Sequence, residues 1–309
     1  MLLAIDVGNT NIVAGIFDGE ELTANFRMST DKTKTSDEIG MLLLQLMSHE
    51  GIDKSAVSDV IISSVVPPVM HSLTNACRRY IGKIPLIVGQ DIVPAISVRI
   101  DNPKEVGADR LVNAVAAKAK YGAPLIVVDF GTATTFCAIN SVGDYVGGVI
   151  SSGIKISMDA LFEKAAKLPR IEIVKPASVI GSNTVASMQS GAVWGYVGQV
   201  EYIVKRVKEE LKTMDNGQWI MDNSGRALEE SPQESPVGLA DTPFIKGGIK
   251  AQTQGAPGAS RPTSEGVKVV ATGGLAAMIA ECTDGIDFVD RLLTLEGLRI
   301  IYENRGESL

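Results

Sequence analysis

Short apolar runs alternate along the chain with longer stretches in which apolar residues recur at helical spacing. The short runs predict strands, and the longer stretches predict helices. Two apolar runs begin at residues 2 and 125, and the other predicted strands lie at 12–18, 22–29, 60–66, 85–89, 135–141, 144–151 and 267–276. The predicted helices lie at 37–50, 69–81, 108–122, 155–167, 184–212 and 294–305. Such alternation is typical of an α/β protein.

One pattern occurs in both halves of the chain. Residues 2–10 read LLAIDVGNT, and residues 125–135 read LIVVDFGTATT. Each is an apolar run followed by an aspartate, one apolar residue, a glycine and a hydroxyl-rich turn, and each continues into two more strand-like runs. Because internal repetition indicates duplicated structural units, we predict two strand-rich lobes of related design, at 1–121 and 122–309.

Residues 215–266 differ from the rest of the chain. They are rich in Pro, Gly, Ser and Gln and show no sustained period. Loops longer than about 12–15 residues are rare inside compact domains. We therefore interpret this segment as an insertion into the second lobe, mostly mobile. A small folded element around WIMDN at 219–223 or PFIKGGI at 243–249 is the alternative.

Composition and charge exclude several classes of function. The net charge of −7 argues against sequence-independent binding of nucleic acid, which needs a basic surface. An acidic protein still binds an anionic nucleotide where glycine-rich turns, helix N-termini or a cation help locally. The 3 cysteines form no CxxC pair, and only 2 histidines occur. Zinc sites, disulfide scaffolds and Ser-His-Asp chemistry are therefore disfavoured.

The chain shows no sign of membrane insertion or export. No apolar run approaches the roughly 20 residues that cross a bilayer. The start, MLLAIDVGNT, has no basic segment and reaches an aspartate after a few apolar residues, unlike a signal peptide. We therefore predict a cytoplasmic protein with reduced thiols and no membrane partner.

The turn after the first predicted strand carries candidate phosphate ligands. Gly8 permits a tight turn and close approach of the backbone to a ligand. Asn9, Thr10 and Asn11 offer amide and hydroxyl donors, and Asp6 suits a magnesium ion or its waters. An ordinary hairpin with a polar turn explains one such copy equally well. The second copy in the other half favours a nucleotide clamp built from both turns.

The second turn carries the matching groups. Thr132 is placed to bond a terminal phosphate oxygen, and Asp129 to hold a cation beside the phosphates. The neighbours of Asp129 are strongly apolar, so its buried carboxylate needs a partner or an ion. Neither a GxxxxGK[ST] motif nor a GxGxxG motif after a strand occurs. Phosphates must therefore be held by paired hairpin turns.

Three other glycine-containing or polar stretches stand at element ends. Asp109, in the GADR stretch at 107–110, lies in the first turn of the strongest predicted helix, where the helix dipole favours a carboxylate for purely structural reasons. The functional alternative is that Asp109 takes the proton from an acceptor alcohol while Arg110 binds an anionic group. Residues 147–153 predict a strand-to-helix turn that lets a ligand touch the backbone. Asn183-Thr184 either caps the long helix or presents Thr184 to a substrate.

Taken together, the motifs resemble those of the type III pantothenate kinases, in the superfamily of actin, sugar kinases and the Hsp70 ATPase domain. The matching stretches, in the family's order, are DVGNTNIVAGIFD, DNPKEVGADRLVNA, DFGTATTF, YVGGVISSGI, NTVASMQSG and VVATGGLA. They cover nearly the whole chain outside 215–266. The resemblance implies an α/β fold of two duplicated ribonuclease H-like domains with a cleft between them. It also implies ATP-dependent phosphorylation of pantothenate to 4′-phosphopantothenate, the first step of coenzyme A biosynthesis.

The resemblance further implies roles for individual residues. The first phosphate loop for ATP would be Asp6, Val7, Gly8, Asn9, Thr10, Asn11, Ile12 and Val13, with Thr132 as a further ATP ligand. Asp109 would be the general base. Pantothenate would be contacted by Gly107, Ala108, Asp109, Arg110 and Thr184. Asp129 would hold a monovalent cation, potassium or ammonium, alongside magnesium. The family is dimeric, with the active site near the subunit interface.

The sequence departs from the family pattern in a few places. Ser151-Ser152-Gly153 stands where Ala-Pro-Gly is common, and Ile100 stands where many members carry a substrate-contacting Tyr. Two alternatives therefore stay open: a non-catalytic relative linked to transcription, or an enzyme of the same superfamily acting on another small alcohol or as a phosphatase. The retained Asp6, Asp109 and Asp129 favour a catalyst over a pure binding module.

Overall fold

The computed structural model describes residues 1–215, 220–221, 227–228 and 266–306. The insertion predicted at 215–266 lies almost wholly outside this part of the chain. Within that insertion, Ile220–Met221 (β9) and Ala227–Leu228 (β10) pair as short antiparallel strands. Strand β9 lies within the stretch 219–223, where a small folded element is the alternative expectation, and the other such stretch, 243–249, lies outside the described residues.

The first half of the chain builds one five-stranded sheet in the order β3-β2-β1-β4-β5. Its strands are β1 (Leu2–Val7), β2 (Asn11–Asp18), β3 (Glu21–Ser29), β4 (Asp59–Ser64) and β5 (Leu86–Ile87). The first three form an antiparallel meander, and β4 and β5 continue the sheet in parallel with β1. The helices of this half are α1 (Ser36–His49), α2 (Pro67–Ala76) and α3 (Ala108–Tyr121), with a π-helical turn at Cys77–Ile81 and 3₁₀ turns at Lys54–Ala56 and Pro103–Glu105.

The second half repeats this topology, with the strand order β12-β11-β6-β7-β8. Its strands are β6 (Leu125–Phe130), β7 (Ala133–Ile139), β8 (Tyr145–Ser152), β11 (Lys268–Gly273) and β12 (Phe288–Val289). Here β6, β7 and β8 are the antiparallel meander, and β11 lies parallel to β6 as β4 lies parallel to β1. The helices are α4 (Ile154–Lys164), α5 (Thr184–Asp215), α6 (Ala276–Ala280) and α7 (Leu293–Glu303), followed by a 3₁₀ turn at Asn304–Gly306. The predicted fold of two duplicated ribonuclease H-like units is confirmed.

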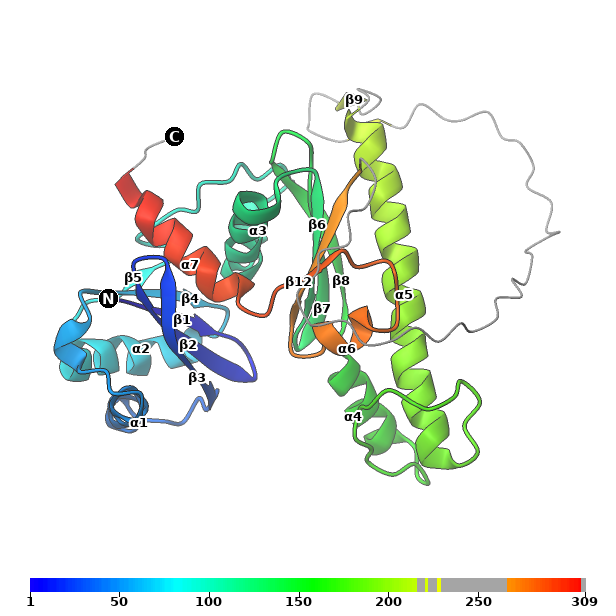
Figure 1. Ribbon diagram of the computed structural model, residues 1–309, viewed down its shortest axis with the longest axis horizontal. Helices are drawn as coiled ribbons and strands as arrows, with labels where there is room; N and C mark the ends of the chain where they lie inside the picture. The colour runs from blue at the N-terminus through cyan, green and yellow to red at the C-terminus, as the bar shows by residue number, and fades with distance from the viewer. Residues whose placement is uncertain (216–219, 222–226, 229–265, 307–309) are drawn as a thin grey trace.

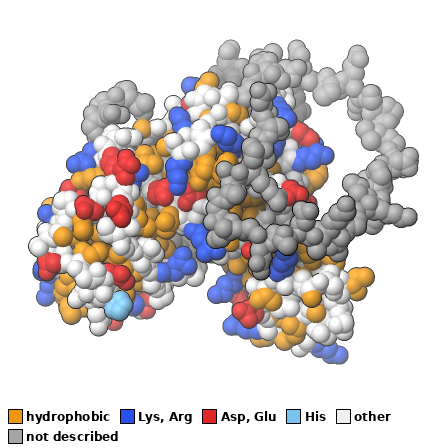
Figure 2. All heavy atoms as spheres, viewed as in Figure 1, with side chains coloured by type: hydrophobic (Ala, Val, Ile, Leu, Met, Phe, Trp, Pro, Cys, Tyr) orange, Lys and Arg blue, Asp and Glu red, His pale blue; other side chains and the backbone are white. Residues whose placement is uncertain are grey.

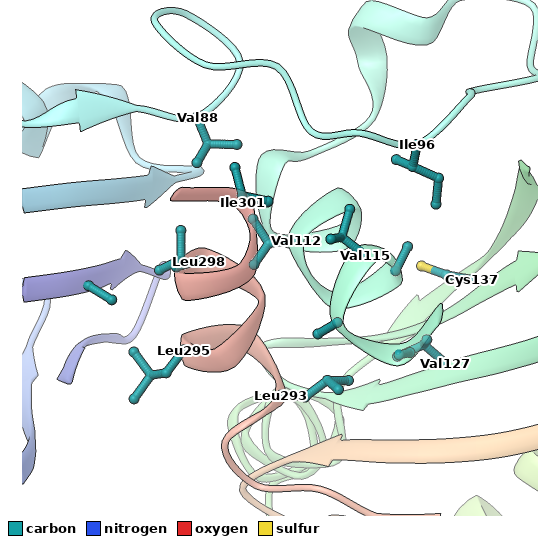
Figure 3. Close-up of a cluster of buried hydrophobic side chains, with 14 of the residues drawn as sticks. Val88, Ile96, Val112, Val115, Val127, Cys137, Leu293, Leu295, Leu298 and Ile301 are labelled. Carbon is teal, nitrogen blue, oxygen red and sulfur yellow. The ribbon is translucent and has the colours of Figure 1, made fainter. Parts of the chain in front are cut away.

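Helices α3 and α7 form a middle layer between the two sheets, whereas α1 and α2 lie beside the first sheet and α5 beside the second (Figure 1). Figure 3 shows Leu295 and Leu298 of α7 directed toward the first sheet, and Val115 of α3 facing Cys137 of the second. One buried apolar cluster therefore runs from sheet to sheet through these helices. Separate clusters pack α1 and α2 on the first sheet, and α5 and α6 on the second.

An ion-pair network joins α3 to α7. Lys120, near the end of α3, forms ion pairs with Asp290 and with Glu296 of α7, and the Tyr121 hydroxyl donates to Asp290 at 2.9 Å. The helices also approach closely, because a Cβ atom at Gly297 would lie 2.4 Å from the Val112 carbonyl oxygen. Helix α7 thus packs against elements of the first predicted lobe, and the boundary between residues 121 and 122 stays a prediction.

Two local expectations differ from the structure for identifiable reasons. The helix predicted at 69–81 begins two residues earlier, because Pro67 opens α2 at its first position, where proline loses no helical hydrogen bond. The strand-to-helix turn expected across 147–153 is confined to Gly153, and Gly147 and Gly148 lie inside β8. Glycine is required at 148 because a Cβ atom there would lie 1.9 Å from the Phe136 carbonyl oxygen on β7.

Candidate active site

The two repeated turns meet between the lobes. The turn between β1 and β2 is closed by the Gly8 N–H, which donates to the Asn11 carbonyl at 3.0 Å. The turn between β6 and β7 is closed in the same way, by the Gly131 N–H and the Ala133 carbonyl at 3.1 Å. The hydroxyl oxygens of Thr10 and Thr132, one from each turn, lie 2.9 Å apart. The turns expected to act as a pair are therefore in contact.

In the space-filling view the two lobes are joined at one side and separated by a notch at the lower edge (Figure 2). Several Lys and Arg side chains, drawn in blue, lie beside this notch. The local cations matter because the protein as a whole carries a net charge of −7. Lys and Arg side chains are the groups with which an anionic ligand would pair at this notch.

Each turn is held by hydrogen bonds from a residue outside the turn. The Thr30 hydroxyl, just after β3, donates to the Gly8 carbonyl at 2.6 Å, and its N–H donates to the Thr10 carbonyl at 3.0 Å. The Gly153 N–H, at the start of α4, donates to the Thr132 carbonyl at 3.1 Å. Thr30 had no signal in the sequence, since an isolated threonine after a strand is common.

Only part of the first predicted phosphate loop offers side chains to a ligand. Asn9 and Thr10 are exposed, whereas Val7 and Ile12 are buried in the core of the first lobe. Val13 is partly buried and packs against the cluster between the sheets. For these apolar residues, only backbone groups are available to a phosphate.

Three aspartates influence one another electrostatically across the two lobes. Asp6 lies near the end of β1, Asp129 lies at the equivalent place on β6, and Asp109 lies in the first turn of α3. Burial raises the pKa of Asp6 to about 7, and the charges of Asp109 and Asp129 add to the rise. Burial also raises the pKa of Asp129 to about 7, with a further contribution from Asp109. In the described part of the chain, no lysine or arginine forms an ion pair with any of them.

The carboxylate of Asp129 is held by a chain of hydrogen bonds from α3 and α7. The side-chain amide of Asn113, which is buried, donates to Asp129 Oδ2 at 3.3 Å. The Thr294 hydroxyl of α7 donates to the Asn113 Oδ1 atom at 2.7 Å, which fixes the orientation of the amide. These partners were absent from the sequence interpretation, because they meet only through the packing of α3 against α7.

The other oxygen of Asp129 faces bare backbone. A Cβ atom at Gly273 would lie 2.6 Å from Asp129 Oδ1 and 2.7 Å from the Phe130 carbonyl oxygen. Glycine also suits this position because its φ is +91°. A carboxylate oxygen and a carbonyl oxygen thus lie close together beside backbone that has no side chain, and oxygen ligands of this kind suit a hard cation.

Asp109 is positioned by its own helix end. Its Oδ1 accepts a hydrogen bond from the Arg110 N–H at 2.8 Å and lies only 2.5 Å from where a Cβ atom at Gly107 would stand. Glycine at 107 therefore makes room for this carboxylate. Burial raises the pKa of Asp109, while the Arg110 N–H and the positive charge of Arg110 counteract part of the rise. A carboxylate with a raised pKa is a stronger proton acceptor than an exposed one.

Thr184 is the first residue of α5. The cap of α5 is supplied by Asn183, whose Oδ1 accepts a hydrogen bond from the Ala186 N–H at 2.9 Å. Thr184 itself is exposed and borders a cavity of about 440 Å³ between α4 and α5, lined also by Met158, Leu161, Leu168, Ser187, Met188, Gly191 and Ala192. Capping is therefore not the role of Thr184.

The described residues contain no group of three or more His, Cys, Asp or Glu side chains close enough to hold one metal ion. The three aspartates thus form no compact metal centre of their own. Single carboxylates combined with phosphate oxygens are the usual arrangement for a cation at a nucleotide. The partly buried carboxylates of Asp6 and Asp129, which have no cationic side-chain partner in the described part, fit such an arrangement.

Comparison with known proteins gives a family and a fold. The model of the type III pantothenate kinase family matches residues 2–206. A crystal structure of a protein assigned to the Baf family of transcriptional activators from Campylobacter jejuni is 16% identical, with a TM-score of 0.51, and the match covers 99% of this chain and 100% of that one. A protein assigned as a 2-dehydro-3-deoxygalactonokinase from Sinorhizobium meliloti is 11% identical, with a TM-score of 0.49 and coverage of 100% and 98%. None of the described helices is both long and apolar enough to span a membrane.

Proposed function

The chain belongs to the type III pantothenate kinase family, and from this premise we propose how its residues divide the work of phosphoryl transfer. It is an ATP-dependent kinase that converts pantothenate to 4′-phosphopantothenate, the first step of coenzyme A biosynthesis. The observation that carries the residue assignments is the contact between Thr10 and Thr132, which brings both repeated turns to one place. Phosphoryl transfer depends mainly on positioning and on neutralising charge, and paired turns suit both tasks.

ATP is assigned to the two turns. Residues 6–13 would hold its phosphates through backbone N–H groups and through the exposed side chains of Asn9 and Thr10. Thr132 would donate its hydroxyl to a phosphate oxygen from the opposite turn. The bonds from Thr30 and Gly153 support this assignment, because they hold the turns in place before any ligand binds.

Asp109 is assigned as the general base that takes the proton from the pantothenate hydroxyl. This assignment is supported by the raised pKa of Asp109 and by the hydrogen bond from the Arg110 N–H that fixes its carboxylate. The charge of Asp109 also raises the pKa of Asp6 and of Asp129, so the three carboxylates interact. A positioned base of this kind contributes about 10²–10⁴-fold to the rate. The hydroxyl oxygen would then attack the terminal phosphorus of ATP, and ADP would leave.

The kinase uses ATP with a divalent metal. We assign magnesium to Asp6 and a monovalent cation, potassium or ammonium, to Asp129. When bound, these cations would neutralise negative charge on the phosphates during transfer. The support is that both carboxylates are partly buried without a cationic side-chain partner in the described part, and that Asp129 Oδ1 and the Phe130 carbonyl oxygen lie close together beside the bare backbone of Gly273.

Pantothenate is assigned to Gly107, Ala108, Asp109, Arg110 and Thr184, and the protein is proposed to be a homodimer. A homodimer is supported by exposed apolar side chains on the edge strand β8 and on the adjoining α4: Val149, Ile150 and Ile156 are 36%, 65% and 46% exposed. An edge strand with apolar side chains is a surface that another chain usually covers.

We further propose two lobes at 1–121 and 122–309 and a cytoplasmic location.

A coupled assay of ADP release tests the function directly. Purified protein with ATP, magnesium and potassium should release ADP when pantothenate is added, and mass spectrometry should detect 4′-phosphopantothenate. Other small hydroxy acids should release much less ADP, and omission of potassium should slow the reaction. ADP release without a phosphorylated pantothenate product would contradict the assignment, and turnover of another alcohol would favour the alternative kinase.

A further inference from the structure

We propose that Cys137 and Tyr145 are positioning residues that hold the Arg110 guanidinium so that its terminal N–H groups meet the carboxylate of pantothenate. This inference rests on the proposed substrate role of Arg110. It adds two residues of the second sheet, Cys137 on β7 and Tyr145 on β8, which lie outside the GADR stretch that contains Arg110.

The contacts of Arg110 reach from α3 to the second sheet. Its Nε donates to the Sγ atom of Cys137 on β7 at 3.3 Å, and its Cζ atom lies 5.7 Å from the centre of the Tyr145 ring. The Tyr145 hydroxyl in turn donates to the same sulfur at 3.8 Å. Arg110 is thus held by its Nε atom and by its place over the Tyr145 ring, which leaves the Nη atoms as donors for a ligand.

The sheet is shaped to receive this side chain. Cys137 is paired with Gly148 across β7 and β8, and Figure 3 shows the Cys137 sulfur directed toward α3. A Cβ atom at Gly148 would lie 3.1 Å from Arg110 Nη2, so the glycine leaves room for the guanidinium. Cys137 and Tyr145 are 2% and 1% exposed, so they form a rigid support rather than a mobile one.

The support orients the arginine without neutralising it. Among the described residues, Arg110 forms no ion pair with a carboxylate. Burial raises the pKa of Cys137 despite the opposing charge of Arg110, so the sulfur stays a neutral thiol and does not act as a counter-ion. A half-buried guanidinium with neutral partners keeps its charge and its paired N–H groups for a ligand, and a carboxylate matches that geometry.

The test compares Cys137→Ala with Cys137→Ser and measures the KM for pantothenate and the KM for ATP separately. Alanine removes the acceptor of the Arg110 Nε, so the KM for pantothenate should rise about tenfold, with the KM for ATP unchanged. Serine restores an oxygen acceptor, so it should recover most of the loss. A purely structural cysteine predicts the reverse order, because a buried hydroxyl is tolerated less well than a methyl group.

Tyr145→Phe and Tyr145→Leu separate the ring from the hydroxyl. Phenylalanine keeps the face on which the guanidinium rests and should change the KM for pantothenate by about twofold at most. Leucine removes the ring and should raise this KM more than phenylalanine does. Melting temperatures of all variants are measured in parallel, so a loss of fold is recognised as such.

Arg110→Gln distinguishes failure of this inference from failure of the substrate assignment. If Arg110→Gln leaves the KM for pantothenate unchanged, Arg110 does not bind the carboxylate, and both proposals about this residue are overturned. If Arg110→Gln raises the KM but Cys137→Ala does not, only the positioning role is overturned. The positioning role also requires that Cys137→Ala add nothing further in the Arg110→Gln background, because the two changes would remove one shared interaction.

Discussion

The hydroxyl oxygens of Thr10 and Thr132 lie 2.9 Å apart, although 122 positions separate the two residues along the chain. Each stands in the turn that follows an aspartate-bearing strand, one in each half. The duplication of the fold thus has a direct chemical consequence, because equivalent turns of the two lobes meet face to face. A triphosphate between them would be held from both sides.

Replacing Thr132 by valine tests this arrangement. The substitution keeps the branched shape and removes the hydroxyl. The KM for ATP should rise roughly 10- to 100-fold, since a hydrogen bond to a charged group contributes about 1.5–3 kcal/mol. The KM for pantothenate should change less. Thr23→Val is the control, because the Thr23 hydroxyl donates to Ile16, at the end of the first sheet away from Asn11. An unchanged KM for ATP in Thr132→Val would argue against Thr132 as an ATP ligand.

Asp109→Asn tests the general base. Asparagine has nearly the same shape and its side-chain oxygen still accepts the Arg110 N–H, but it does not take a proton at neutral pH. The kcat should fall about 10²–10⁴-fold, with ATP binding retained. Isothermal titration with ATP and a steady-state ADP assay measure the two effects. Asp101→Asn, at an exposed aspartate a few residues earlier, is the matched control. Normal turnover by Asp109→Asn would remove Asp109 from the mechanism.

The sequence allowed prediction of those parts of the site that are local and repeated. Asp6 and Asp129 stand out because the same short sequence pattern surrounds both. The strands that carry them are predicted by the short apolar runs in which the two aspartates lie. The contact of Asn113 with Thr294 spans 181 positions and exists only because α7 returns to pack beside α3. Apolar periodicity predicts both helices but not their mutual placement, so such contacts were out of reach.

Thr294→Val tests whether the bonds behind Asp129 matter for function. Valine removes the hydroxyl that orients the Asn113 amide, and the amide is then free to turn away from Asp129. We expect a several-fold lower kcat and a higher potassium concentration for half-maximal rate, with little change in the KM for pantothenate. Thr213→Val is the control, because the Thr213 hydroxyl bonds only within α5, to Glu209. Wild-type potassium dependence in Thr294→Val would contradict a positioning role.

The raised pKa values make a prediction about stability and pH. The pKa of Asp129 is about 7 in the folded chain, against an ordinary value of 3.8. Between these values the folded state binds more protons than the unfolded state, so the free energy of unfolding falls as pH rises through this window. Asp129→Asn abolishes this contribution. Its stability relative to the wild type should therefore increase from pH 5 to pH 8 by on the order of 2–4 kcal/mol, since one pKa unit corresponds to about 1.4 kcal/mol.

Urea unfolding of both proteins, in buffers free of potassium and magnesium, measures this difference. The comparison cancels the contributions of groups that the two proteins share. A constant stability difference across the pH range would show that Asp129 titrates normally. Added potassium should reduce the difference at pH 8 if Asp129 holds the cation, because a bound cation offsets the cost of the buried charge.

Gly153→Ala tests how the start of α4 supports the second turn. Gly153 has an ordinary backbone conformation, with φ of −68°, so alanine introduces no strain of its own there. Its Cβ atom, however, would lie 2.3 Å from the Thr132 carbonyl oxygen and 2.6 Å from that of Gly131, both of them backbone atoms. The turn or the helix must therefore move, so we expect a lower melting temperature. We also expect a kcat/KM for ATP that is at least roughly tenfold lower, because a misplacement of about 1 Å at such a site costs up to about 10²-fold.

Gly198→Ala is the matched control, because a Cβ atom at Gly198 in α5 meets nothing within 4 Å. That change should leave the kinetics unaltered and stabilise the protein by roughly 0.5–1 kcal/mol, since alanine favours a helix over glycine. If Gly153→Ala behaved like Gly198→Ala in both measurements, the contact between α4 and the second turn would have no part in binding ATP.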